Sequence, residues 1–314
     1  MNLKINRDIS GEIESPALLA GWPGMGNVGV GAVDYIRRKI DAVPFAEVDM
    51  KEYFTPEAVE VENGIAKFPD LPSHVFYYVP SSNLIIFESE TQVAGGGGVS
   101  LMNQILDLAQ QLGVRTVYTG AAFAMPISHK QEVQVLGVAN QSSLRDTLEP
   151  HGVEILQQGH ISGLNGLLLG FAGLRDIEAA CLLATMPQYA IQMPNPKASR
   201  AIVQVFESLL DIEVDMSEID EAAEQVNRSM GEIEGKIQSG FSSMAKEAKE
   251  EGEEEELDQL DEEKVPQYVM ERIERLFHEV QSEGSKEKAA QLKKELDRWE
   301  LYSLYEDRFL NLFR

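Results

Sequence analysis

The strongest constraint on the fold is an alternation of short apolar runs with helical patterns through the first two thirds of the chain. Residues 17–20 form a wholly apolar run, and residues 28–40 follow with apolar side chains at helical spacing. The same succession returns at residues 84–87 and 99–112. Short strands that are apolar throughout are typical of a sheet covered by helices. We therefore expect an α/β fold with a mainly parallel sheet.

Other segments fit the same plan. Asn63-Gly64 lies inside residues 58–68 and predicts a hairpin with a type I′ turn, in which both central residues have positive φ. Asn195 and Pro196 are predicted as the N-cap and first residue of a helix to residue 210. Further strands are predicted at residues 43–48, 74–79, 116–118, 133–138 and 155, and a helix at residues 143–149. Residues 177–185 form an apolar run that is expected to be buried.

The chain changes character near residue 212. Beyond it Glu, Lys, Leu, Met and Ala dominate, which are helix formers, and 29 of the 52 acidic residues lie there. We predict two domains, an α/β domain over residues 1–212 and an acidic helical extension over residues 213–314. Residues 245–263 carry eleven acidic and two basic residues, so a flexible linker is expected near residues 245–264.

The extension opens with an apolar stripe at nearly heptad spacing from Ile219 to Phe241. An amphipathic helix must bury such a stripe against the α/β domain, against another helix or against another subunit. Later apolar residues at Ile273, Leu276 and Val280 repeat the spacing, and a final helix is expected from Ser285. The residues of this stripe that are predicted to contact a partner are Ile219, Val226, Met230, Ile233 and Ile237.

Charge and cysteine content exclude several classes of function. The 27 basic and 52 acidic residues give a net charge of −25, which opposes binding to nucleic acid or to an anionic membrane. A single cysteine excludes a disulfide scaffold and a thiolate metal site. No apolar run is long enough to span a bilayer, and the first residues lack the apolar region of a signal peptide. We expect a cytoplasmic protein.

Three glycine clusters, at residues 21–31, 95–98 and 163–173, adjoin predicted strands or helices. Gly24 to Gly29 matches G-x-G-x-x-G, so the amides there are candidates for holding a phosphate, although Pro23 removes one donor and Trp22 is bulky. Gly95 to Gly98 has no P-loop lysine after it. The alternative for these clusters is architecture: tight turns, a hinge and close backbone packing. The residues of these ligand or architectural loops are Gly21, Trp22, Pro23, Gly24, Met25, Gly26, Asn27, Gly29, Gly95, Gly96, Gly97, Gly98 and Asn165.

Catalytic patterns are sparse. No two histidines have metal-ligand spacing, and no G-x-S-x-G motif occurs. Glu88 and Glu90 share one face of a strand, so they form either a carboxylate pair with a raised pKa or a solvated strand end. Ser128-His129-Lys130 is expected on a loop surface. We predict no catalytic residue, no metal and no cofactor.

The glycine segment also carries a family resemblance. Gly21-Trp22-Pro23-Gly24-Met25-Gly26-Asn27-Val28-Gly29, with Ala32-Val33-Asp34-Tyr35 after it, resembles the opening motif of the proteasome assembly chaperone 2 (PAC2) family. Segments 163–169, 180–185 and 195–198 resemble later parts of that family in the same order. The resemblance covers residues 1–212. Some archaeal and bacterial members have also been labelled an ATP-grasp superfamily, but the chain has no ATP-grasp pattern of nucleotide-binding lysines.

The resemblance implies a three-layer α/β/α domain of the phosphorylase/hydrolase-like kind and a role without catalysis. Members of known role act through protein contacts, and some reach the proteasome through a C-terminal motif of a hydrophobic residue, Tyr and any residue. This chain has Leu312 in the first position and Phe313 in place of the tyrosine, so the resemblance implies Leu312 and Phe313 as further partner contacts. We predict a chaperone-like assembly or scaffold factor that acts as a homo-oligomer, with proteasome subunits or another protein as partner. The alternative is a small-molecule or nucleotide-binding protein, or an enzyme, that uses the glycine loops.

Overall fold

The structure is a computed structural model that describes residues 2–53, 58–250, 273, 276–277, 280 and 286–298. The chain divides into two compact units, Met1–Phe241 and Ser242–Arg314. We call the first unit the body. Compactness therefore groups residues 213–241 with the α/β part of the chain, whereas a functional boundary at residue 212 stays a prediction.

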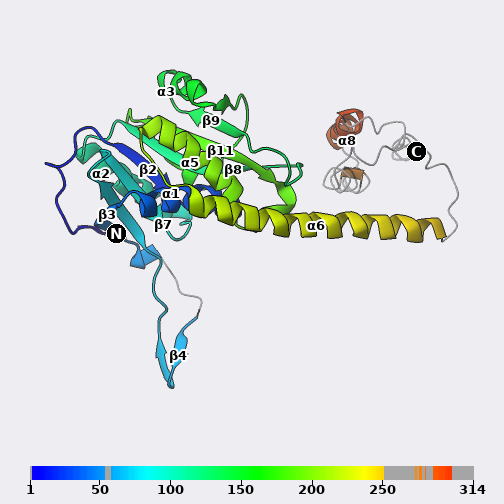
Figure 1. Cartoon of the computed structure of the whole chain (residues 1–314), viewed down its shortest axis with the longest axis horizontal. Helices are drawn as coiled ribbons and strands as arrows, with labels where there is room; N and C mark the ends of the chain where they lie inside the picture. The colour runs from blue at the N-terminus through cyan, green and yellow to red at the C-terminus, as the bar shows by residue number, and fades with distance from the viewer. Residues whose placement is uncertain are drawn as a thin grey trace. The chain divides into compact units, whose positions relative to one another are not determined.

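A large sheet forms the centre of the body (Figure 1). Its described strands run in the order β1-β3-β6-β7-β2-β8-β11-β9-β10. The central neighbours β7, β2, β8 and β11 are parallel, and antiparallel pairs flank them on both sides. The strands are β1 (Asn2–Ile5), β2 (Ala17–Gly21), β3 (Val43–Asp49), β6 (His74–Val79), β7 (Leu84–Ser89), β8 (Thr116–Met125), β9 (Val135–Ala139), β10 (Glu154–Ile155) and β11 (Glu178–Pro187).

Helices cover both faces of this sheet. Helices α1 (Val28–Lys39), α3 (Ser142–Leu148) and α5 (Pro196–Leu210) bury one apolar cluster with the sheet. Helices α2 (Gly95–Gln111) and α4 (Leu164–Gly173) bury a second cluster on the opposite face. The predicted α/β class and its three layers are confirmed, with the parallel pairing in the centre of a mixed sheet.

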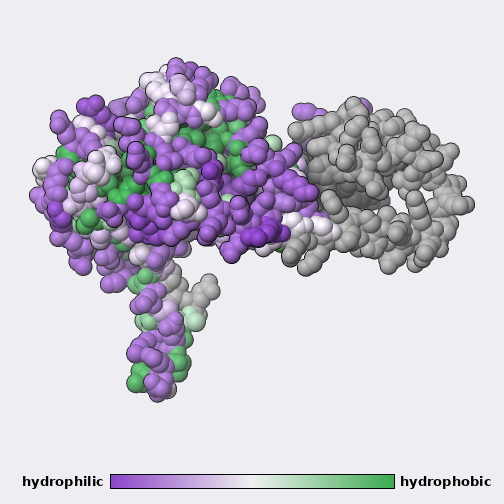
Figure 2. Space-filling model, in the orientation of Figure 1, coloured by the Kyte–Doolittle hydropathy of each residue, from purple (hydrophilic) through white to green (hydrophobic). Residues whose placement is uncertain are grey.

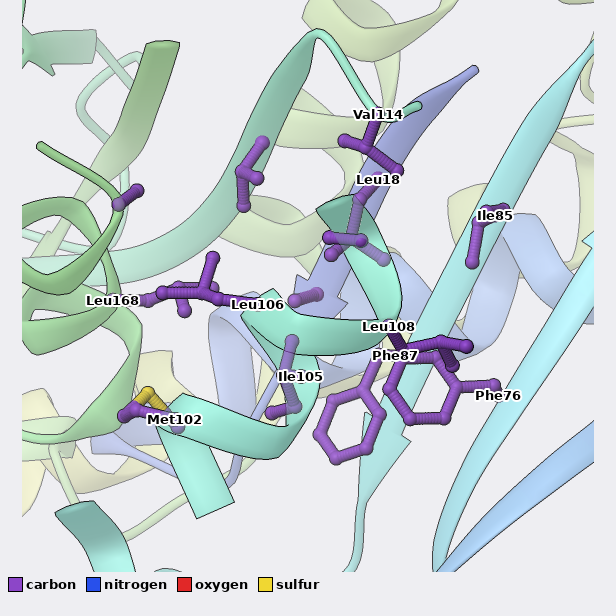
Figure 3. Packing of buried hydrophobic residues seen from close by; sticks show 14 of the residues in the cluster. Leu18, Phe76, Ile85, Phe87, Met102, Ile105, Leu106, Leu108, Val114 and Leu168 are labelled. Atoms are coloured by element: carbon purple, nitrogen blue, oxygen red, sulfur yellow. The ribbon is translucent and has the colours of Figure 1, made fainter. Parts of the chain in front are cut away.

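The second cluster shows why the helical spacing in the sequence was informative. Ile105 and Leu106 of α2 are fully buried, and Figure 3 shows Leu106 beside Leu168 of α4. Strands β6 and β7 add Phe76 and Phe87, whose ring centroids lie 4.7 Å apart. Apolar residues at helical spacing on α2 thus meet alternate side chains of the strands, and burial of their surface stabilises the layer by about 25 cal/mol per Å².

A small hairpin forms a separate two-stranded sheet. Its strands β4 (Glu60–Glu62) and β5 (Ile65–Lys67) pair antiparallel around Asn63 and Gly64. Asn63 has φ 52° and Gly64 has φ 78°, as a type I′ turn requires. Figure 1 shows the hairpin extending away from the large sheet, and we call residues 58–68 the arm.

Several boundaries differ from the sequence prediction. Helix α2 begins at Gly95 and not at residue 99, because the glycine run forms its first turn. Helix α4 was not predicted, since its glycine-rich apolar sequence has little helical periodicity. Strand β1 is too short to give a pattern. The predicted cap of α5 is confirmed: the Ala198 amide donates to Asn195 Oδ1 at 3.1 Å.

Two helices follow in the rest of the chain. Helix α6 (Ser217–Glu250) confirms the helix predicted from the apolar stripe, and it includes residues 245–250 of the predicted linker. Residues 251–264 of that linker lie outside the described part of the chain. In the second unit, α8 (Lys286–Arg298) buries Ala289, Leu292 and Leu296, as the sequence pattern predicted for a helix there.

Candidate functional site

The first glycine cluster follows β2 at the edge of the sheet where β7 also ends. Gly21, the last residue of β2, lies opposite Glu88 near the end of β7. Helices α1 and α2 begin just after these strands. In open α/β sheets this edge is the usual place for a ligand. A ligand at this edge would need hydrogen-bond donors that the loop does not already use.

Trp22 and Asn165 are clamped together at this edge. The Trp22 amide donates to Asn165 Oδ1 at 3.1 Å, and Asn165 Nδ2 donates to the Trp22 carbonyl at 3.1 Å. Thr119 of β8 donates from its hydroxyl to the Asn165 carbonyl at 2.8 Å. The Trp22 side chain is fully buried beside Phe87, and its Nε1 has no hydrogen-bond partner among the described residues. Two of the predicted loop residues, 143 positions apart in the sequence, are thus joined by two reciprocal hydrogen bonds.

Gln92 connects the next part of the loop to α4. Its Nε2 donates to the Pro23 carbonyl at 2.6 Å, and its Oε1 accepts from the Leu164 amide at 3.1 Å. Gly24 and Met25 remain exposed at the tip of the turn. Gln92 was not singled out from the sequence, because a single glutamine in a loop gives no pattern.

Gly26 and Asn27 turn the chain into α1 with positive φ angles of 58° and 48°. The Gly26 amide donates to the Ile191 carbonyl at 2.8 Å, and the Asn195 amide donates to the Gly26 carbonyl at 2.8 Å. A Cβ added at Gly26 would lie 2.9 Å from the Met186 Cε atom. The glycine therefore fits both a left-handed backbone and a tight space.

Gly29 lets α1 lie directly on the sheet. A Cβ at this position would lie 1.9 Å from the Gly120 carbonyl oxygen on β8, a distance that no side chain tolerates. The close approach is between two backbones, so a rotamer change does not relieve it. The third glycine of the motif thus sets the separation between helix and sheet.

These contacts limit what the first loop is able to bind. The amides of Trp22, Gly26 and Asn27 already donate to Asn165, Ile191 and Gly24. A phosphate that used them would have to break hydrogen bonds that hold the loop together. The geometry accordingly favours the architectural interpretation of Gly21 to Gly29 over the phosphate-binding one.

The second glycine cluster, Gly95 to Gly98, is buried in one half and exposed in the other. Gly95, with φ 59°, and Gly96 are exposed at the start of α2. Gly97 and Gly98 are buried, and a Cβ at Gly98 would lie 2.4 Å from the Val93 carbonyl oxygen. Of the two architectural alternatives, hinge or packed turn, the contacts of Gly97 and Gly98 favour a packed turn.

Glu88 and Glu90 do not form a carboxylate pair. Glu88 forms an ion pair with Arg37 of α1, and Arg37 also pairs with Asp34. Glu90 instead accepts a hydrogen bond from the Ser73 amide at 2.8 Å. Burial raises the pKa of Glu88 from 4.5 to about 7, against the lowering effect of Arg37. The sequence suggested a raised pKa here, but its cause is burial and not Glu90.

His129 is predicted on a loop surface, and this prediction is wrong. It is buried, and its ring Nδ1 pairs with Glu234 of α6, which also accepts a hydrogen bond from Ser128 Oγ at 3.1 Å. Lys197 Nζ donates to the carbonyls of His129 and Gln131 at 3.0 and 2.7 Å. The loop at residues 128–131 is therefore hydrogen-bonded to α6 through Glu234 and to α5 through Lys197.

The predicted partner residues of α6 are largely used inside the body. Ile219 and Met230 are buried in the same apolar cluster as α1 and α5, and Val226 packs against it. Ile233 is half-buried. The side chain of Ile237, together with Leu312 and Phe313, lies outside the described residues. Of the three destinations left open for the stripe, its first part takes the α/β domain.

Within the residues that the structure describes, no group of three or more His, Cys, Asp or Glu side chains has an arrangement that could hold a metal ion. No helix among those residues has the length and apolar character to cross a membrane.

Comparison with known proteins finds a matching protein family and a related archaeal protein. The model of the PAC2 family matches residues 18–234. The uncharacterized protein MJ1210 of Methanocaldococcus jannaschii is 26% identical over 224 residues, which cover 70% of this chain and 84% of that protein. Nothing in these matches supports the ATP-grasp label.

Solved structures share the fold. Pyrococcus furiosus PbaB, described as an archaeal proteasome activator, is 26% identical with a TM-score of 0.62, covering 74% of this chain and 98% of PbaB. P. furiosus PbaA, described as an archaeal homolog of proteasome-assembly chaperone, is 21% identical with a TM-score of 0.59, covering 79% and 98%. A PAC2 family protein of Streptomyces avermitilis is 24% identical with a TM-score of 0.60, covering 69% and 95%. The last two likenesses concern the fold alone.

Proposed function

The chain belongs to the PAC2 family, and we propose that it is a chaperone-like assembly or scaffold factor that works through protein contacts and not through catalysis. The observation that carries this proposal is the clamp between Trp22 and Asn165. In it, two segments of the family motif bond their polar atoms to each other and leave few donors for a substrate. The polar groups of the loop then maintain the fold, and the partner contacts lie on the surface.

Proteasome subunits are the partner that we propose to test first. The name of PbaB, a relative with 26% identity, links that protein to the proteasome. The net charge of −25 supports a protein partner over nucleic acid. Self-association into a homo-oligomer is part of the same proposal, as is a cytoplasmic location.

The helical extension after the body is proposed to add partner contacts. Residues 213–241 belong to the same compact unit as the α/β part of the chain, so we place these additional contacts from Ser242 onward. A functional boundary is therefore better tested by ending the chain at Phe241 than at residue 212. Ending it at residue 212 would uncover the apolar cluster that Ile219 and Met230 help to close.

The test mixes the purified full chain with purified proteasome α subunits and, separately, with assembled 20S particles, and measures complexes by native mass spectrometry. We expect a complex with at least one of them, weakened in a chain that ends at Phe241. Calorimetry of the same protein with ATP, ADP and inorganic phosphate tests the alternative. Stoichiometric nucleotide binding without any proteasome complex would overturn the proposal.

A further inference from the structure

The apolar side chains of the arm are exposed and are not packed in either apolar cluster of the body. Every residue from Ala58 to Phe68 is exposed. The exposed fractions are 51% for Val59, 68% for Val61, 61% for Ile65 and 72% for Phe68. Figure 2 shows hydrophobic residues along this projection, among hydrophilic ones.

The strand register separates apolar from charged residues on the arm. Val61 pairs with Ala66, so the two side chains share one face. Val59 and Phe68 directly flank the two strands, and the two-residue period continued by one position puts them on the same face. We call these four residues the apolar face. The opposite face carries Glu60, Glu62, Ile65 and Lys67.

An isolated hairpin of this kind is marginally stable in water, because two strands bury little surface. The Asn-Gly turn favours the hairpin locally, but it gives the apolar face nothing to pack on. Concentrated exposure of large apolar side chains marks an interaction surface on a soluble protein. A partner that covers this face would supply the second layer that the two strands lack.

We propose that the apolar face of the arm packs against the same face of the arm of a second copy of this chain. The inference rests on the self-association in the proposed function and names its contact. An apolar face that matches itself about a two-fold axis makes an isologous interface. Stacking two arms in this way gives two layers of two strands, as in a small β-sandwich.

The charge distribution allows a second copy as the occupant, because the apolar face carries no charged residue that would meet its own counterpart. In a face-to-face stack, Glu60, Glu62 and Lys67 all stay on the outer sides in water. Lys67 Nζ lies 3.5 Å from Glu62 Oε2, so the one basic residue of the arm is already paired on that outer side. No charged group has to be buried, although each copy carries a net charge of −25.

The same charge gives the contact a distinctive salt response. Two copies of a strongly acidic chain repel each other, and salt screens that repulsion. Association through the apolar face should therefore tighten between low and moderate salt. Docking on a basic partner by charge attraction would weaken over the same range.

The first experiment measures the mass of the full chain by light scattering over a range of concentrations at two salt concentrations. Val61→Thr combined with Phe68→Thr places a β-branched residue at both positions and removes the two most exposed large side chains of the apolar face. Ile65→Thr is the matched control, equally exposed but on the opposite face. We expect association at least tenfold weaker for the double variant, unchanged association for the control, and the same melting temperature for all three proteins.

The second experiment uses thiol labelling. Cys181 is the only cysteine of the chain and is fully buried, so a cysteine introduced on the arm is the accessible thiol. Val61→Cys should react with a maleimide at least tenfold more slowly at concentrations where the chain associates than where it is monomeric. Ile65→Cys should react at one rate under both conditions.

The outcomes separate the arm from the wider proposal. Wild-type association in the double variant, with no protection of Cys at position 61, overturns the arm contact and leaves self-association standing. A wild-type chain that stays monomeric removes self-association and the arm contact together. Protection of position 61 only after proteasome subunits are added would show a different occupant and overturn the inference.

Discussion

Two glycines in this chain share a backbone conformation and have opposite surroundings. Gly26, at the sheet edge, has φ 58°, and Gly64, in the arm, has φ 78°. A Cβ at Gly26 meets Met186 and Asn195, whereas a Cβ at Gly64 meets nothing within 4 Å. The same local turn chemistry therefore fixes the core in one place and a free-standing element in the other. What a turn does for a protein is decided by what packs on it.

The largest expected effect lies beside Gly26. Gly29→Val should prevent α1 from packing on β8, because the new side chain begins 1.9 Å from the Gly120 oxygen. We expect insoluble protein or a loss of about 4 kcal/mol or more in the free energy of unfolding, measured by urea denaturation. Gly170→Ala in α4 is the control, since nothing lies within 4 Å of its added Cβ. A stable Gly29→Val protein would contradict the backbone contact.

The direct form of the comparison replaces both turn glycines by valine. Gly26→Val should lower the free energy of unfolding by about 3 kcal/mol, because a β-branched residue is strained at positive φ and also contacts Met186. Gly64→Val meets the same backbone strain but should change the unfolding of the body by less than about 0.5 kcal/mol, because the arm opens by itself. Equal losses in the two variants would show that the arm and the core unfold together.

The clamp at the sheet edge predicts a smaller loss. Asn165→Ala leaves the buried amide and carbonyl of Trp22 without their partner, and we expect about 2 kcal/mol of destabilisation. Asn103→Ala, which removes one partly buried hydrogen bond from Arg175, should cost less than about 1 kcal/mol. Chemical denaturation of the two variants measures the difference. Similar losses in the two variants would show that the hydrogen bonds between Trp22 and Asn165 stabilise the fold no more than an ordinary, partly buried hydrogen bond.

The smallest effect is a dependence on pH. Native Glu88 holds its proton more tightly than the unfolded chain does, because burial raises its pKa from 4.5 to about 7. Its contribution to stability is therefore complete below pH 4.5 and is lost as the pH rises to about 7. Glu88→Gln should reduce this decline by about 1 kcal/mol or more in melts over that range. Glu62→Gln on the exposed arm should leave the decline unchanged.

Local pattern was sufficient for much of the fold. The apolar run of β2, the spacing of α2, the Asn195 cap and the Asn63-Gly64 turn each follow from neighbours in the sequence, because strand period, helix period and turn geometry are local properties. The motif around Gly24 to Gly29 also carried the family resemblance. Helix α4 escaped because its apolar side chains lie all around it, and a helix without a polar face gives no period.

The partners of each group were decided by tertiary structure alone. For Glu88 the sequence left open a pair with Glu90 or a solvated strand end, but the fold supplies Arg37 from another element. It offered the stripe of α6 to a partner, but Ile219 and Met230 close the body instead. Trp22 meets Asn165 across 143 residues. A sequence fixes which side chains seek burial or a hydrogen bond, whereas only the packed chain brings together the groups that satisfy them, because those contacts join segments that no local period relates.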